Sequence, residues 1–314
     1  MRTLVVGAGA LGGYYGGRLA DAGQDVTFLV RPKRAQQLAE RGLSVVSMHG
    51  DAHVAAPKTV QAGTITQQYD LVLIATKSYG LATALDDMAP AVGSSTLVLP
   101  ILNGMRHMET LACRFGPERV LGGTAIIIAT LGQEGEVRQL MPNETLTFGE
   151  PGGGMSRRVK SLLAFMQGAN FNPKASEIVI QEMWEKWLGL TTNAAITCMM
   201  RSTIGDILIA PGGRAMILAL IGECQAVASA AGFAPRREFM EFIVKLLTTE
   251  GSPLSASMMR DIEAGAETEA DHIHGDFITR AGDLGVATPL LRIAYCHLRT
   301  YAARRAREGG PRQP

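Results

Sequence analysis

Three glycines near the start of the chain have the spacing that binds a phosphate group. The segment Gly7-Ala8-Gly9-Ala10-Leu11-Gly12 fits the pattern G-x-G-x-x-G, after a strand-like run at Thr3–Val6 and before helical periodicity over residues 11–22. In that context the first glycine permits a tight turn, the second lets the backbone approach a pyrophosphate, and the third lets helix and strand pack closely. We predict a dinucleotide site in which all six residues line the phosphates at the helix N-terminus. A turn with a purely structural role is the alternative.

The residues after the second predicted strand, which spans 25–30, indicate which dinucleotide binds. An NAD site usually carries Asp or Glu there, to accept a hydrogen bond from the ribose 2′-hydroxyl. Here the strand continues into Arg31-Pro32-Lys33-Arg34. Cations pair directly with a 2′-phosphate, so we predict NADPH/NADP+ as the cofactor, with Arg31 as a ligand. The alternative is a solvated basic loop that opens a helix.

Two further polar side chains follow predicted strands. Lys77 follows the strand at residues 71–76, and Asn103 follows the strand at 96–102. Ligands of open α/β sheets bind at the carboxyl ends of the strands. We therefore expect Lys77 to approach the cofactor ribose or phosphate, and the Asn103 amide to bridge nicotinamide ribose and substrate. A simple turn is the alternative for Asn103-Gly104.

The elements that must position these residues change in kind along the chain. Strand-like runs with apolar residues on both faces alternate with helical periodicity over residues 11–22, 32–41 and 81–88, which predicts a doubly wound α/β sheet. Short strands then follow at residues 125–131, 136–141 and 145–148, with spacing that favours antiparallel pairing, and a helix at 156–167. The strand signals end near Ser176. We predict an NADP-binding Rossmann-like domain over residues 1–176 and an all-α domain over 177–314.

In the second predicted domain, Gly and Pro interrupt the helical pattern. The breaks lie at residues 211–213, 232–235, 251–253 and 285–289. The basic, Gly/Pro-rich segment 304–314 predicts a frayed terminus.

Composition narrows the class of protein. The 314 residues carry 30 Lys+Arg against 29 Asp+Glu, a balance that argues against a nucleic-acid or membrane-surface partner. There is no purely apolar stretch of membrane-spanning length and no signal-peptide pattern after Met1-Arg2. The four cysteines are far apart without C-x-x-C spacing, which favours reduced thiols in a cytoplasmic protein: Cys113, Cys198, Cys224 and Cys296. The sequence leaves open whether the protein forms a homodimer.

His272 and His274, beside Asp271, raise the question of a metal site. Residues two apart on a helix point to different faces, so this pair does not chelate one ion easily. No other cluster has metal-ligand spacing, and we predict a metal-free protein.

Nearly the whole chain resembles the ketopantoate reductase (2-dehydropantoate 2-reductase) family. Beyond the glycine loop and Arg31, the resemblance rests on segments in the family's order and spacing: Ala75-Thr76-Lys77, Leu102-Asn103-Gly104-Met105, Trp184-Glu185-Lys186, Ser257-Met258 and Thr268-Glu269. It implies a Rossmann-like domain, a helical domain, and an active site in the cleft. It also implies NADPH-dependent reduction of a 2-keto acid, ketopantoate giving (R)-pantoate on the route to pantothenate and coenzyme A.

The resemblance gives roles to residues that the pattern alone leaves ambiguous. Lys186 corresponds to the lysine that stabilises the developing alkoxide and donates a proton, a role suited to an ammonium group. Glu269 helps hold the substrate hydroxyl, and Ser257 binds the substrate carboxylate. Ala129 matches a position whose backbone touches the nicotinamide. Without the resemblance, Lys186 and Ser257 are ordinary helix residues, and Glu269 is one of several acids nearby.

The chain departs from the family's pattern beyond Lys186. The family usually shows asparagines four and eight residues after this lysine, where this chain has Leu190 and Ala194. Asn193 stands seven residues after Lys186, which returns to nearly the same helix face, so we expect it to contact the substrate. Two alternatives stay open: a sister reductase for another 2-keto acid, and a non-catalytic NADPH-binding regulator.

Overall fold

The computed structural model describes residues 1–309 and divides them into two compact units. The first unit holds residues 1–103 and 107–180, and the second holds residues 104–106 together with the chain from Gln181 onward. The sequence placed the division at 176. In the structure it falls just inside the long helix α6 (Val179–Met200), and the short loop segment Gly104–Arg106 groups with the second unit.

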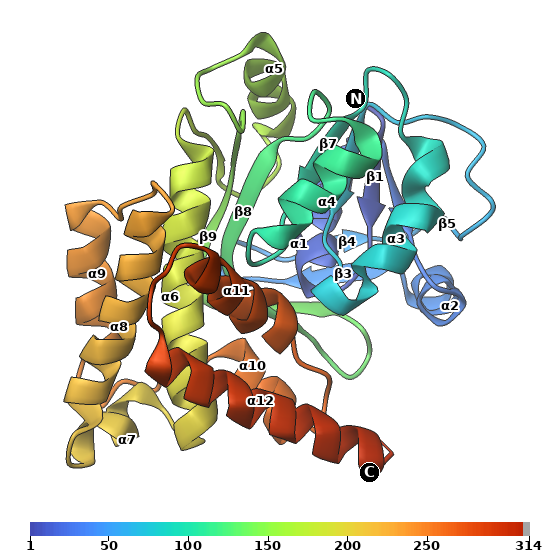
Figure 1. The fold of residues 1–314 in the computed structure, drawn as a ribbon. Helices are drawn as coiled ribbons and strands as arrows, with labels where there is room; N and C mark the ends of the chain where they lie inside the picture. Colours follow the sequence, from blue (N-terminus) through green and yellow to red (C-terminus); the bar gives the residue numbers. More distant parts are fainter. Residues whose placement is uncertain (310–314) are drawn as a thin grey trace. The chain divides into compact units, whose positions relative to one another are not determined.

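A five-stranded parallel sheet forms the centre of the first unit (Figure 1). Its strands stand in the order β5-β2-β1-β6-β7. Their bounds are β1 (Thr3–Val6), β2 (Val26–Leu29), β5 (Lys58–Val60), β6 (Leu71–Ile74) and β7 (Leu97–Pro100). The four strands that the sequence predicts are confirmed. The short edge strand β5 was missed, because its three residues are exposed or half-buried and lack the continuous apolar run of a central strand.

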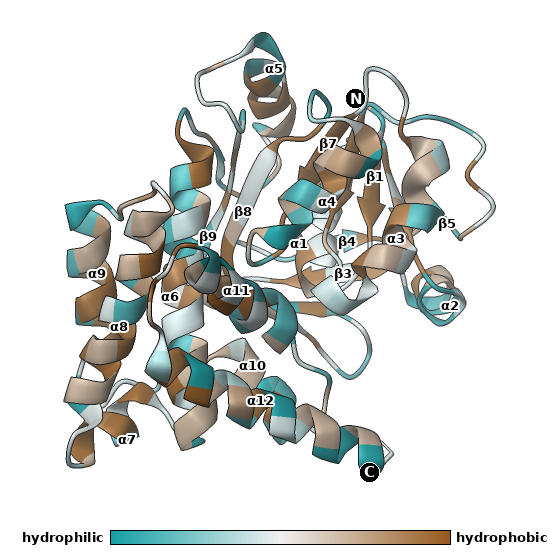
Figure 2. Ribbon diagram, viewed as in Figure 1, coloured by the Kyte–Doolittle hydropathy of each residue, from teal (hydrophilic) through white to brown (hydrophobic). Residues whose placement is uncertain are grey.

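Successive side chains of the central strands enter two separate hydrophobic cores. Val5 and Phe28 belong to one core, whereas Leu4, Val6 and Leu29 belong to the other. Alternation of this kind follows from the period of two along a strand. In Figure 2 strands β1 and β7 are accordingly hydrophobic along their length, whereas helix α2 is largely hydrophilic.

Helices cover both cores. Helix α1 contributes buried residues to the first core, and helices α3 and α4 contribute to the second. The helices of the first unit have these bounds: α1 (Ala10–Asp21), α2 (Pro32–Arg41), η1 (Ser78–Gly80), α3 (Leu81–Met88), η2 (Ala89–Ala91), α4 (Arg106–Phe115) and α5 (Arg157–Met166).

A second, mixed sheet completes this unit. It has the order β10-β9-β3-β4, and β8 pairs antiparallel with β9, as the spacing predicts. The strands are β3 (Leu43–Val46), β4 (Ala52–Val54), β8 (Gly122–Leu131), β9 (Val137–Gly149) and β10 (Pro173–Ala175). The separate strands predicted at 136–141 and 145–148 form one strand. Pro142 lies where the register shifts, a position that tolerates proline.

Within the described residues from Gln181 onward, the regular elements of the second unit are all helices, joined by loops. Each of the four predicted breaks separates two helices, and the breaks at 211–213 and 285–289 end on the first residue of the next helix. The helices are α6, α7 (Ile204–Ile209), α8 (Gly213–Ala230), α9 (Arg237–Leu247), α10 (Ser257–Glu263), the π-helical turn η3 (Asp271–Gly275), α11 (Asp276–Asp283) and α12 (Pro289–Arg307). Helix α12 continues to Arg307, so the prediction of fraying from residue 304 is wrong there. Residues 310–314 of that predicted frayed segment lie outside the described residues. This architecture, a Rossmann-like sheet followed by a helical domain, is the predicted fold class.

Candidate active site

The strand order of the parallel sheet creates a switch point between β1 and β6. The chain continues to β2 and β5 on one side of this pair and to β7 on the other. The register places Leu29, Val6, Ile74 and Pro100 in one row at the carboxyl ends of their strands. Ligands of open α/β sheets bind beyond such a row. The residues that follow it are those predicted from the sequence: the glycine loop at 7–12, Arg31, Lys77 and Asn103.

The three loop glycines meet different steric conditions. Gly7 has a φ of +93°, which disfavours any other residue. A Cβ on Gly12 would lie 1.9 Å from the Gly7 carbonyl oxygen, so α1 requires glycine there to pack on β1. Gly9 has an ordinary φ of −80°, and a Cβ added to it meets no protein atom within 4 Å. Protein packing therefore does not explain glycine at position 9, whereas close approach of a ligand to the backbone does.

The beginning of α1 is suited to a pyrophosphate. Gly9 is the N-cap residue and offers no side-chain hydrogen bond to the first turn, which contains Ala10 and Leu11 and no acidic residue. The N–H groups of a first helical turn and the helix dipole both favour an anion. The residues present thus fit the phosphates of a dinucleotide.

The cations after β2 divide into two kinds. Arg34 donates from Nε to the Ala8 carbonyl at 3.0 Å and from Nη1 to the Gly135 carbonyl at 2.9 Å. Arg34 therefore holds the glycine loop in place through the Ala8 carbonyl, a structural role that could not be predicted from the sequence pattern. An interpretation of Arg34 as a free 2′-phosphate ligand does not fit these bonds. Arg31, by contrast, is exposed at the N-cap of α2 and has no side-chain partner among the described residues.

Of the other predicted cofactor residues, Lys77 and Asn103 follow strands at this edge, and Ala129 lies in the second sheet. Lys77 is exposed and caps η1 directly after β6. Asn103 is half-buried after β7, and its amide makes no hydrogen bond to another described residue. Ala129 is half-buried in β8, next to a register shift between Ile127 and itself. Such irregularities often occur beside functional sites.

In the second unit, α6 turns four consecutive side chains to different sides. Trp184 and Trp187 enter an aromatic cluster with Phe233 and Phe277, with ring centroids 4.6–6.2 Å apart. Lys186, which stands between the two tryptophans in the sequence, has a half-buried side chain. Neighbouring residues on a helix point about 100° apart, so Lys186 is directed to a different side of α6 from the two tryptophans.

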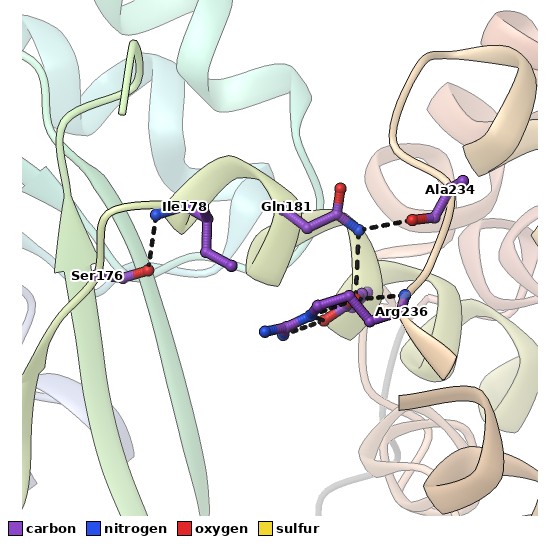
Figure 3. A network of polar contacts seen from close by, with 6 residues as sticks. Ser176, Ile178, Gln181, Ala234 and Arg236 are labelled. Carbon is purple, nitrogen blue, oxygen red and sulfur yellow. Dashed lines mark hydrogen bonds and ion pairs between the residues drawn. The ribbon is translucent and has the colours of Figure 1, made fainter. Parts of the chain in front are cut away.

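Glu185 is occupied by an ion pair. It is 3% exposed and accepts hydrogen bonds from the Arg236 side chain at 2.5–3.2 Å and from the Arg236 backbone at 2.8 Å. Gln181 joins this network and also donates to the Ala234 carbonyl at 3.1 Å (Figure 3). Burial raises the pKa of Glu185, but the bonds from Arg236 and Gln181 outweigh it and hold that pKa below its usual value. Glu185 therefore remains charged and is committed to structure.

Lys186 interacts electrostatically with a second buried carboxylate, Glu269. Glu269 lies between α10 and η3 and is 8% exposed. Burial lowers the pKa of Lys186 to about 8, and the charge of Glu269 opposes that shift. The second unit thus brings together the two predicted catalytic residues. A lysine with a pKa near 8 is mostly protonated at neutral pH and gives up its proton readily, as a general acid must.

The predicted substrate residues lie on α6 and α10. Ser257 is exposed as the first residue of α10. Asn193 is half-buried on α6, and its Oδ1 is buried without a hydrogen-bond partner among the described residues. Leu190 is half-buried, whereas Ala194 is 4% exposed within the core. Ala194 therefore fills a packing position, and Leu190 is the departure that remains accessible.

Among residues 1–309, no group of three or more His, Cys, Asp or Glu side chains is arranged to hold an ion. His272 packs against Gly104, and burial lowers the pKa of His274 to about 4. Within the same described range, no helix combines the length and hydropathy needed to cross a bilayer.

Comparison with known families covers both units. The family described as ketopantoate reductase PanE/ApbA matches residues 3–153, and its C-terminal counterpart matches residues 179–302. A 2-dehydropantoate 2-reductase from Halobacterium salinarum is 30% identical over 296 residues, covering 93% of this chain and 96% of that protein.

Two other similarities extend over almost the full length. An uncharacterized oxidoreductase, YkpB, from Bacillus subtilis is 37% identical over 303 residues, covering 96% of this chain and 99% of that one. The crystal structure of 2-dehydropantoate 2-reductase from Geobacter metallireducens superposes with a TM-score of 0.88 at 27% identity, covering 96% and 99%. Members of this family reduce a 2-keto acid with NADPH. The chain therefore belongs to the ketopantoate reductase family and is an NADP-dependent oxidoreductase.

Proposed function

We propose that this protein reduces ketopantoate to (R)-pantoate, a reaction of pantothenate and coenzyme A biosynthesis. The observation that carries the proposal is the pairing of Lys186 with the buried carboxylate Glu269, at a pKa of about 8 for the lysine. A nucleotide-binding regulator has no need of a desolvated lysine opposite a buried acid. The pair therefore favours catalysis over the regulator alternative.

The chemistry divides between the cofactor and the chain. Bound NADPH supplies the hydride for the ketone carbon. The Lys186 ammonium stabilises negative charge on the ketone oxygen and donates the proton that completes the alcohol. Glu269 accepts a hydrogen bond from the substrate hydroxyl, and Ser257 donates one to the substrate carboxylate. Asn193 offers a further polar contact, since its Oδ1 has no partner among the described residues.

The chain's cofactor residues act at the carboxyl edge of the parallel sheet. The first turn of α1 and the loop before it hold the pyrophosphate through backbone N–H groups. Arg31 would pair with the 2′-phosphate, and Lys77 would bind near the ribose or phosphate. Asn103 would orient the nicotinamide ribose and the substrate, and the Ala129 backbone would contact the nicotinamide.

Leu190 favours a second candidate, a sister reductase for a less polar 2-keto acid. It stands one helical turn after Lys186 and is half-buried, so its apolar side chain borders the face of α6 that carries the lysine. An apolar side chain there gives a substrate hydroxyl no partner, and an unpaired polar group is costly when it is buried.

The test is steady-state NADPH oxidation with ketopantoate and with a panel of 2-keto acids that differ in branching and hydroxylation. Ketopantoate should give the highest kcat/KM. A higher value for an unhydroxylated branched 2-keto acid would select the second candidate. No oxidation with any 2-keto acid, despite tight NADPH binding, would select the regulator.

A further inference from the structure

Trp187 makes a buried hydrogen bond that the proposed chemistry does not use. Its indole Nε1 donates to the Ile273 carbonyl at 3.1 Å, and the two residues are 1% and 5% exposed. The bond joins α6 to the π-helical turn η3, 86 residues later in the chain. π-Helical turns are rare and often mark functional sites.

The backbone of the same residue, Ile273, leads on to Glu269. The Ile273 N–H donates to the Glu269 carbonyl at 2.9 Å, and at the far end of the turn the Asp276 N–H donates to the Asp271 carbonyl. A continuous path therefore runs from Trp187, through Ile273, to the backbone of Glu269. The path begins at Trp187, which is next to Lys186 in the sequence, and it ends at the backbone of Glu269. It therefore links the two residues of the proposed catalytic pair.

Each end of this path is held in place. The Trp187 ring packs edge-on against Phe277 of α11 at 4.6 Å, and the Arg280 guanidinium lies 5.7 Å from its centroid. On the other side of the turn, Asp271 accepts hydrogen bonds from Tyr295 at 2.7 Å and from Arg299 at 2.5 Å. The turn is thus fixed between α6 and α12.

We propose that Trp187 is a positioning residue, whose hydrogen bond to Ile273 fixes the η3 turn and thereby the placement of Glu269 opposite Lys186. The inference rests on the proposed function of that pair. Misplacing a reacting group by about 1 Å can cost on the order of 100-fold in rate, so a bond remote from the substrate can matter for catalysis.

Glu269 is the carboxylate whose charge acts on the pKa of Lys186, whereas Glu182, one helical turn before Lys186, acts on Arg236. Glu185 is paired with Arg236 at the start of α9, and Asp276 with Arg280 on α11. Asp271 is paired with Arg299 of α12. His274 of η3 is buried, and its pKa of about 4 keeps it neutral at assay pH. A change in the titration of Lys186 therefore reports the position of Glu269.

The test compares Trp187→Phe with Trp184→Phe. Both changes remove an indole from the same aromatic cluster, but Trp184 has no hydrogen bond from its ring nitrogen to a described residue. In Trp187→Phe, kcat/KM for the keto acid should fall about tenfold or more. In Trp184→Phe, kcat/KM should stay within about threefold of the value for the unmutated enzyme. NADPH affinity, measured by calorimetry, should be unchanged in both variants.

The pH readout separates positioning from a general loss of packing. Because Glu269 raises the pKa of Lys186, a loosened Glu269 should move the alkaline limb of kcat/KM to lower pH, by roughly half a pH unit or more. An NMR titration of lysine labelled at Cε in the cofactor-free protein, with the Lys186 signal assigned from Lys186→Arg, should show the same shift without reference to activity. In a Glu269→Gln background, Trp187→Phe should cause no further shift.

Circular dichroism checks that the variants fold. If Trp187→Phe does not, Tyr295→Phe loosens the turn from its surface side by removing the bond to Asp271, and it should shift the same limb in the same direction. Unchanged kcat/KM and an unchanged Lys186 titration in the folded variant would overturn the positioning role. An unmutated protein that reduces no 2-keto acid would instead overturn the proposed function, and the NMR titration would still decide the geometry.

Discussion

Four adjacent residues on α6 illustrate how one helical turn distributes tasks. Trp184 packs on Phe233, Glu185 pairs with Arg236, Lys186 interacts electrostatically with Glu269, and Trp187 bonds to Ile273. Successive residues on a helix point about 100° apart, so four neighbours can contact four different parts of the fold. Lys186 was predicted from the family resemblance. The Trp187 bond could not be predicted from the sequence, since the acceptor is a backbone carbonyl.

Arg31 should decide the choice between the two nicotinamide cofactors. It is exposed without a partner among the described residues, and a charge-assisted bond to a 2′-phosphate contributes about 1.5–3 kcal/mol. Arg31→Ala should therefore weaken NADPH binding by roughly 10-fold to 100-fold and leave NADH binding nearly unchanged, measured by calorimetry. Arg41→Ala, at the other end of α2, is the matched control. Equal affinity of the unmutated protein for both cofactors would rule out this role.

Leu190 should influence which keto acid is preferred. If its apolar side chain disfavours a substrate hydroxyl, Leu190→Asn should raise kcat/KM for ketopantoate relative to an unhydroxylated analogue, by roughly tenfold for one hydrogen bond. Ala194 is a control position, because its side chain is buried in the core. An unchanged ratio between the two substrates would remove Leu190 from the specificity argument.

Among the elements, β1, the glycine loop and α1 could be predicted because their signals are local. A buried strand, three glycines and a helical period lie within about twenty residues. The strands of the second sheet were harder to predict from the sequence. Strands β3, β4 and β10 are short and partly exposed, and β3 and β10 pair with β9, which is distant from both in sequence. Pro142 also divides the pattern of β9, although the strand itself continues through it.

Gly9 and Gly12 should respond differently to an added side chain. Gly9→Val meets no protein atom at its Cβ, so the midpoint of thermal unfolding should stay nearly unchanged while NADPH binding is lost. Gly12→Ala places a Cβ 1.9 Å from the Gly7 carbonyl oxygen and should lower that midpoint as well. Calorimetric titration and thermal unfolding of both variants provide the comparison. Normal NADPH binding by Gly9→Val would mean that the loop is only a structural turn.

The turn η3 should make the second unit sensitive to acid through His274. Its pKa is about 4 in the folded protein against an ordinary 6.5, so the unfolded state binds a proton first as the pH falls. The free energy of unfolding should then fall by up to about 1.4 kcal/mol per pH unit between those two values, while above pH 6.5 the contribution is constant. Urea unfolding at pH 7 and pH 5 should give a smaller difference for His274→Leu than for the unmutated protein. Equal differences would contradict a buried neutral histidine.

At the scale of the whole molecule, each unit carries one part of the proposed chemistry. The first contains the dinucleotide-binding edge of the sheet, and the second contains Lys186 and Glu269. The two-part organisation was predictable from the end of the strand signals. The pairing of Lys186 with Glu269 was not predictable from spacing, because 83 residues separate them and tertiary packing alone brings them together. The catalytic role of Glu269 was predicted only from the family resemblance.

The most direct measurement is the rate of NADPH oxidation with ketopantoate by the unmutated protein and by Lys186→Ala, followed across pH. The unmutated enzyme should be active at neutral pH and lose activity as the pH rises through about 8, where Lys186 gives up its proton. Lys186→Ala should lower kcat by about 100-fold or more, with NADPH affinity unchanged. A fully active Lys186→Ala enzyme would contradict the proposed mechanism and leave the catalytic proton donor elsewhere.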